Sequence, residues 1–166
     1  MFMAAVFVAV ALAGCAPEPA PTPSGFTDED AAFAAAEATY RAYVDALNRV
    51  DLSDPETFED VYRWTTGDLN ASDRKGLSTY HAKRFTVTGQ AIVASADRRD
   101  INPEQSSIGL DVCLDVSGVR LTDAAGESQV APDRVDIQRL RIELESASRE
   151  NMLISAITGR EDGPEC

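Results

Sequence analysis

Residues 108–116 read IGLDVCLDV, an uninterrupted alternation of apolar side chains with small or polar ones. Successive side chains of a β-strand point to opposite faces, so this period of two predicts a strand with one face in a core and the other in water. The predicted core face carries Ile108, Leu110, Val112, Leu114 and Val116. The predicted solvated face carries Gly109, Asp111, Cys113 and Asp115.

More strands are expected on both sides of this one. Residues 86–93 are rich in β-branched side chains and predict a strand, which a polar loop over 97–106 would join to the central strand. Residues 135–146 and 152–158 predict the last two strands. The result is a bent antiparallel sheet of about four strands.

Within the stretch 135–146 the alternation changes phase. Val135 and Ile137 have the opposite parity to Leu140, which begins the run of inward side chains. An extra residue in one strand of an antiparallel pair changes the parity in this way. A β-bulge is therefore expected between Ile137 and Leu140.

The residues that precede the strands have a helical period. Apolar side chains over 33–47 recur every three or four positions, which predicts an amphipathic helix capped by Thr27. Asp54 would cap a second helix, and residues 72–73 a third. Helices followed by antiparallel strands predict an α+β fold, with N-terminal helices packed on one face of a bent sheet.

Length and charge limit the classes of function. The chain has 166 residues and a formal net charge of −13, enough length for one domain with a single core. A strongly negative protein is repelled by the phosphates of nucleic acids and by anionic lipid surfaces. Nucleic acid is therefore not expected as a partner.

The N-terminal residues have the pattern of an export signal. Residues 3–11 are apolar and uncharged, and Leu12-Ala13-Gly14-Cys15 follows them. This segment resembles the bacterial lipoprotein signal, an aliphatic residue and two small ones before an invariant cysteine. The resemblance implies that residues 1–14 are a signal peptide and that Cys15 carries lipid. Residues 1–3 lack the expected Lys or Arg, so a start codon upstream of Met1 is expected.

A proline-rich segment follows the lipidation motif. Residues 15–25 carry prolines at alternating positions near their start, a composition that favours extended polyproline II structure. At about 3.1 Å per residue such a tether can hold a domain roughly 30 Å from a bilayer. The folded domain is expected to be residues 26–166.

The chain contains three cysteines. If Cys15 is acylated, Cys113 and Cys166 can pair in only one way, and an extracytoplasmic compartment permits the bond. A structural disulfide without redox function is expected, which would pin the C-terminal segment across the outer face of the sheet. Two free thiols are the alternative.

The order of elements also suggests a family. The helix over 33–47, Trp64, the strand over 108–116 and Cys166 are similar to the nuclear transport factor 2-like superfamily, a cystatin-like cone. More narrowly, Val112-Cys113-Leu114-Asp115-Val116-Ser117 with a cysteine at the C-terminus resembles small secreted actinobacterial lipoproteins of that class. The resemblance implies a cone-shaped pocket between the helices and the sheet.

Candidate site residues are few. Aromatic side chains and the single histidine could line an apolar pocket or simply fill it; they are Tyr62, Trp64, Tyr80, His81 and Phe85. His81 could act as a general base if a carboxylate such as Asp60 or Asp68 shared its cavity. No spaced set of metal ligands is visible, so no metal and no cofactor is expected.

The sequence thus predicts a lipid-anchored domain on the extracytoplasmic face of the cell membrane. It would be non-catalytic and bind a small apolar ligand or a protein of the cell envelope. The alternative is an isomerase, dehydratase or cyclase that uses His81 in a cone-shaped pocket. The oligomeric state stays open, a homodimer included.

Overall fold

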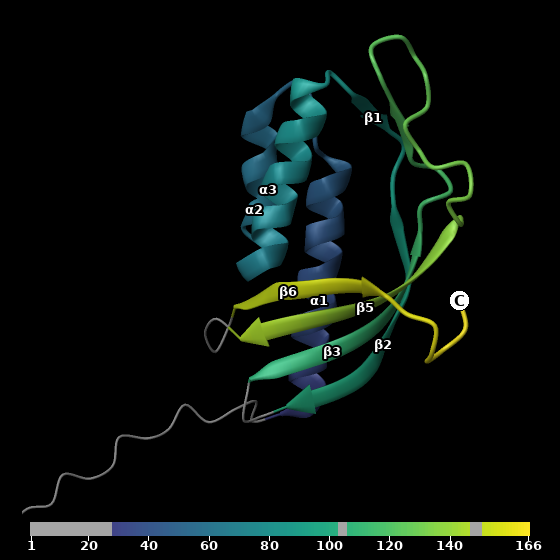
Figure 1. Ribbon diagram of the computed structural model, residues 1–166. Coiled ribbons are helices and arrows are strands. Elements are labelled where there is room, and N and C mark those ends of the chain that lie inside the picture. The colour runs from purple at the N-terminus through teal and green to yellow at the C-terminus, as the bar shows by residue number, and fades with distance from the viewer. Residues whose placement is uncertain (1–27, 103–105, 147–150) are drawn as a thin grey trace, which may run out of the picture.

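The computed structural model describes residues 28–102, 106–146 and 151–166. In these residues the protein has an α+β fold, in which helices pack against antiparallel sheets, as the sequence predicts. The main sheet has the strand order β2-β3-β5-β6 and is strongly curved (Figure 1). The helices gather on one side of this sheet, and α1 passes behind it in the view of Figure 1.

The helical part begins with α1 (Glu29–Asn48). Its N-cap is Asp28, whose carboxylate accepts hydrogen bonds from the backbone N–H groups of Asp30 and Ala31. The cap therefore lies one residue after the predicted Thr27. The 3₁₀-helix η1 (Pro55–Phe58) follows with Asp54 as its N-cap, as predicted, and continues into α2 (Glu59–Tyr62).

The third helix starts earlier than the sequence suggested. It is α3 (Gly67–Ala82), so the proposed cap at 72–73 is wrong. Gly67 has a φ of +56°, a conformation that glycine adopts without strain. Asn70 ties the start of the helix to the preceding segment through hydrogen bonds to the carbonyl oxygens of Tyr62 and Thr65. The N-cap residue Thr66 makes no side-chain cap hydrogen bond, so no capping pattern in the sequence marks this start.

The main sheet contains β2 (Ile92–Asn102), β3 (Ser107–Asp115), β5 (Ile137–Ser146) and β6 (Met152–Gly159). The expected loop over 97–106 is mostly wrong, because β2 continues through Asn102 beside β3. Register shifts between Val93 and Ser95 and between Arg98 and Asp100 interrupt this pairing. β2 is an edge strand of the sheet. Bulges and charged side chains are common on edge strands because they discourage pairing with other chains, so the polar composition of β2 is compatible with a strand.

The predicted bulge in β5 is also misplaced. The register between β3 and β5 is continuous from Ser107↔Glu145 to Asp115↔Ile137. The irregularity lies instead between Glu143 and Leu144, where the partner in β6 changes from Ala156 to Ile154. The parity of Val135 does not indicate a bulge, because Val135 precedes the strand and is 62% exposed.

A short two-stranded ribbon extends from the main sheet. It pairs β1 (Thr86–Thr88) with β4 (Arg120–Thr122) in antiparallel register. The segment after β4 turns at Gly126, whose φ is +85°. In Figure 1 the ribbon and its loop stand at the upper right, away from the helices.

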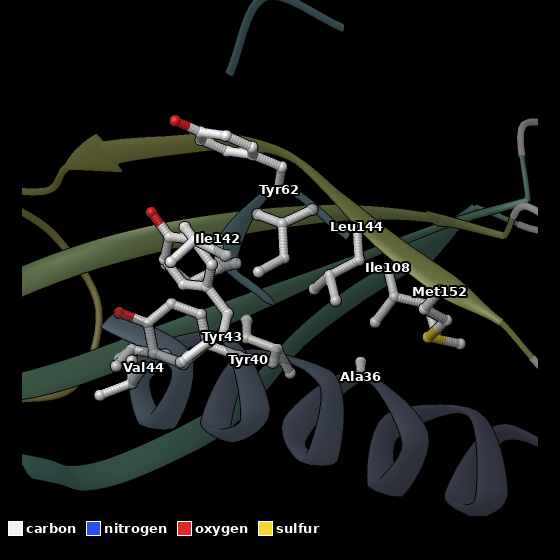
Figure 2. Close-up of a cluster of buried hydrophobic side chains, with 14 of the residues drawn as sticks. Ala36, Tyr40, Tyr43, Val44, Tyr62, Ile108, Ile142, Leu144 and Met152 are labelled. Atoms are coloured by element: carbon white, nitrogen blue, oxygen red, sulfur yellow. The ribbon is translucent and has the colours of Figure 1, made fainter. Parts of the chain in front are cut away.

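The core lies between α1 and the concave face of the main sheet. Figure 2 shows Ala36, Tyr40 and Val44 of α1 facing Ile108, Ile142 and Leu144 of the strands. The largest core side chains that are less than 2% exposed to solvent include Tyr40, Ile108, Leu110, Ile142, Leu144 and Ile154. The periodicities of 33–47 and 108–116 therefore identify the two faces that meet.

The outer face of β3 differs from the prediction. Asp111 and Cys113 lie on the face opposite the core residues, as expected, but they are only 5% and 3% exposed. Residues 160–166, here called the C-terminal strap, cover them (Figure 1). Alternation reports which side chains share a face, and a distant segment of the same chain decides whether that face is wet.

The signal peptide over 1–14, Cys15 and the tether over 15–25 lie outside the described residues. Of the helices in the described part, none combines the length and the hydropathy that crossing a membrane requires. The predictions for the N-terminal segment stay predictions.

Candidate ligand-binding groove

A groove of about 380 Å³ lies between the second half of α1 and the start of β2. Its volume is within the range of small-molecule sites. Helix α1 contributes Arg41, Val44, Asp45, Asn48 and Arg49, and the other wall consists of Gln90, Ala91, Ile92 and Val93. Val44 is buried at the base, whereas Ile92 is 60% exposed. The groove thus has a mixed lining in which polar and charged groups predominate and Ile92 is the exposed large apolar side chain.

Two side chains of α1 fix the wall formed by residues 90–93. The Asn48 amide donates to the Ala91 carbonyl oxygen at 2.9 Å and accepts from the Ala91 N–H at 2.9 Å. Arg41 Nη1 donates to the Val93 carbonyl oxygen at 3.1 Å, and a second guanidinium nitrogen pairs with Glu37 at 2.9 Å. These bonds satisfy backbone groups that a neighbouring strand would otherwise satisfy. The two walls of the groove are therefore fixed relative to each other by contacts of the fold.

Arg49 differs in its contacts from Arg41, the other arginine of the groove. Within the described residues its guanidinium forms no hydrogen bond and no ion pair, a property that it shares with Arg84 alone among the described arginines. Arg84 does not line the groove. A guanidinium presents a planar set of donors that matches carboxylate and phosphate oxygens. Arg49 is thus available to an anionic group in the groove.

The predicted pocket residues lie elsewhere. Tyr62 is buried beneath Arg74, whose guanidinium carbon is 4.0 Å from the ring centroid. Trp64 packs partly buried against the core. Tyr80 and Phe85 are in mutual contact, with ring centroids 5.7 Å apart, near the C-terminal end of α3. None of them lines the groove described above.

His81 has a structural partner. Its Nδ1 lies 2.8 Å from the Leu52 carbonyl oxygen, and its ring contacts Phe58 edge to face. Asp68 is at the other end of the same helix, roughly 20 Å away along the axis. Asp60 pairs with Arg63 at 2.6 Å on the surface. The structure therefore brings neither carboxylate to His81, which is itself exposed.

The buried tyrosines of α1 belong to the core. Tyr43 Oη is 3.3 Å from Asp73 Oδ1, and burial raises the pKa of Tyr40 and of Tyr43 far above the usual range. Desolvation also raises the pKa of Asp73, against the opposing effect of hydrogen bonds from Tyr43 and Thr65. The hydroxyls of Tyr40, Tyr43 and Tyr62 point the same way in Figure 2. The hydroxyl groups of Tyr40 and Tyr43 therefore stay protonated, and these side chains contribute packing and, for Tyr43, a hydrogen bond.

The predicted disulfide is confirmed. Cys113 and Cys166 are bonded, with their Cα atoms 5.5 Å apart. The bond ties the C-terminal strap to the outer face of β3, as the sequence predicts. Sequence reasoning missed the groove, since Arg41 and Val93 are 52 positions apart and nothing local marks them as neighbours.

Comparisons with known proteins identify no family. No family model matches the chain, and no characterised protein matches it. Among solved structures the chain is similar to the solution NMR structure of a de novo designed β-sheet protein, at 13% identity and a TM-score of 0.31. That similarity covers 81% of this chain and 92% of the designed chain.

Proposed function

We propose that this protein is a lipid-anchored binding domain on the extracytoplasmic face of a cell membrane. The lipid is attached to Cys15, residues 1–14 are removed, and the tether over 15–25 separates the domain from the bilayer. The proposal rests on Leu12-Ala13-Gly14-Cys15 and on the proline-rich segment that follows. On the resemblance of its sequence motifs alone, we also propose the nuclear transport factor 2-like cone as its family.

The groove between α1 and β2 is the proposed binding site. Its ligand is a small amphipathic anion, whose apolar part contacts Ile92 and whose acidic group meets Arg49. The observation that carries this assignment is the unengaged guanidinium of Arg49 beside a largely exposed isoleucine. The sequence predicts an apolar ligand. The ligand proposed here also carries an acidic group, and it binds in the groove and not among the predicted pocket residues.

Binding is preferred to catalysis because His81 is engaged by the Leu52 carbonyl group. A general base must lie within reach of the proton that it removes. The carboxylates expected to assist His81 lie far from it or are paired with arginine. No observation therefore favours the isomerase, dehydratase or cyclase alternative.

Replacing Cys15 with alanine should abolish incorporation of labelled palmitate and release the protein from the membrane fraction, because the lipid has no other attachment point. Cells expressing the wild-type chain and Cys15→Ala are labelled and fractionated. The Cys113→Ala variant serves as the control, and it should still incorporate label. Continued labelling of Cys15→Ala would contradict the anchor.

Replacing Arg49 with glutamine should weaken the binding of dodecanoate about tenfold, since a charge-assisted hydrogen bond contributes roughly 1.5–3 kcal/mol. Dodecanoate and uncharged dodecanol are titrated into the protein by NMR, and the shifts of residues 44–49 and 91–93 are followed. Arg84→Gln, which removes the other unengaged guanidinium, should leave the affinity unchanged. Equal binding of dodecanol, or equal effects of the two substitutions, would overturn the proposed ligand class.

A further inference from the structure

The C-terminal strap places a guanidinium against both sulfurs of the disulfide. Arg160 Nη2 lies 3.9 Å from Cys113 Sγ and 3.8 Å from Cys166 Sγ. The Arg160 side chain is 0% exposed, and its Nη1 donates to the Asp162 carbonyl oxygen at 2.6 Å. Its backbone N–H donates to the Arg139 carbonyl oxygen at 3.0 Å. The cation therefore has a fixed position beside the S–S bond.

The charged groups around Cys113 are three arginines and three carboxylates, and the arginine nearest its sulfur is Arg160, whose side chain is 0% exposed. The groups that face it are Arg139, Arg141 and Arg160, opposed by Asp111, Asp162 and Glu165. Asp111 is buried, but the side chains of Asp162 and Glu165 are 76% and 91% exposed, so water screens their effect. Positive groups beside a sulfur stabilise its thiolate form. Because Arg160 Nη2 is about equally close to both sulfurs, it can stabilise whichever of them leaves as a thiolate.

The two cysteines also differ in exposure. Cys113 is 3% exposed, whereas Cys166 is an exposed residue at the end of the strap. Thiol–disulfide exchange requires an accessible sulfur for the attacking thiolate and favours a leaving thiol of low pKa. The difference in exposure favours attack at Cys166. Cys113 then leaves, and Arg160 lies beside its sulfur.

We propose that the Cys113–Cys166 bond is a thiol-exchange site whose substrate is a small extracytoplasmic thiol. The thiolate of that molecule attacks Cys166 Sγ, and the S–S bond breaks. The electron pair of this bond goes to Cys113 Sγ, which leaves as a thiolate beside Arg160. The products are a mixed disulfide on Cys166 and a free Cys113, so atoms and electrons balance without another reactant. This goes beyond the inert bond that the sequence suggests.

The site of modification tests the proposal. The oxidised, folded protein is incubated with reduced glutathione, quenched with acid and digested for peptide mass spectrometry. Glutathione is expected on Cys166, with Cys113 free. The rate should be independent of urea below the unfolding transition, because exchange occurs in the folded state. Modification of Cys113, or a rate that rises with urea in parallel with unfolding, would overturn the proposal.

Variants test the role of Arg160 separately. Arg160→Gln should slow the exchange roughly three- to tenfold, and Arg160→Lys should restore most of the rate, because the charge is what stabilises the leaving thiolate. Arg120→Gln is the matched control, since Arg120 donates only to the carbonyl groups of Ser117 and Val119. Faster exchange in Arg160→Gln would show that Arg160 only holds the strap in place. Should Arg160→Gln fail to fold, the wild-type modification site and Arg160→Lys still decide the question.

Discussion

Replacing Asp111 with alanine is expected to lower the free energy of unfolding by about 3–5 kcal/mol, because it leaves a buried cation without its counter-charge. Asp111 Oδ1 lies 3.7 Å from Arg141 Nε and 3.8 Å from Arg160 Nε. The Arg160 side chain is completely buried, so water cannot replace the lost carboxylate. Gly163 approaches so closely that a Cβ atom there would lie 2.4 Å from Asp111 Oδ2. The strap is thus fitted around this carboxylate.

The measurement is urea unfolding of the oxidised protein, with the free energy taken from the midpoint and slope. The control is Asp115→Ala, on the same strand and the same face, where Ser117 N–H is the partner of an otherwise solvated carboxylate. That substitution should cost about 1 kcal/mol or less. An equal loss in the two variants would contradict the account of Asp111 as the buried partner of Arg160.

Removal of the disulfide is the second large effect. Cys166→Ser should lower the free energy of unfolding by roughly 2–4 kcal/mol, since the bond closes a long loop in the unfolded chain. The joined residues are 53 positions apart. The C-terminal strap should lose protection against hydrogen exchange, while the main sheet keeps its own. Cys113→Ser should resemble Cys166→Ser. Unchanged protection of residues 160–165 in Cys166→Ser would show that the bond is not what holds the strap.

The two effects should be less than additive. Releasing the strap carries Arg160 into solvent, and the cation then no longer depends on Asp111. A double-mutant cycle of Asp111→Ala with Cys166→Ser measures this coupling. An additive result would mean that the buried ion pair and the disulfide stabilise the protein independently.

The inner face of the domain was predictable from local patterns. The period of residues 33–47 identifies the face of α1 that is buried, and the alternation over 108–116 identifies the face of β3 that meets it. The cap at Asp54 follows from a side-chain oxygen beside a proline. Such patterns work because each reflects a contact between residues close in sequence or a single buried face.

The outer face was not predictable in the same way. A polar alternation is the same whether water or another segment covers it, and here the strap covers Asp111 and Cys113. The pairing of Cys113 with Cys166 was the one signal that linked the strap to β3. This pairing was predicted from the number of cysteines and from the expected compartment. The periodicity of the sequence does not indicate it.

The groove depends on contacts of still longer range. Asn48 and Arg41 hold residues 91–93 through side-chain bonds to backbone groups, which have no sequence signature. The aromatic residues chosen as pocket candidates were selected for side-chain type. In the structure Tyr62, Tyr80 and Phe85 find partners in neighbouring cations and rings.

We expect the three cysteines to divide into one that carries lipid and two that join the strap to the sheet. Non-reducing peptide mass spectrometry of the protein purified from membranes tests both halves in a single digest. The account predicts an N-terminal peptide that begins at acylated Cys15 and a linked pair of peptides containing Cys113 and Cys166. An unmodified Cys15 that retains residues 1–14, a disulfide from Cys15 to either other cysteine, or free thiols at Cys113 and Cys166 would contradict it.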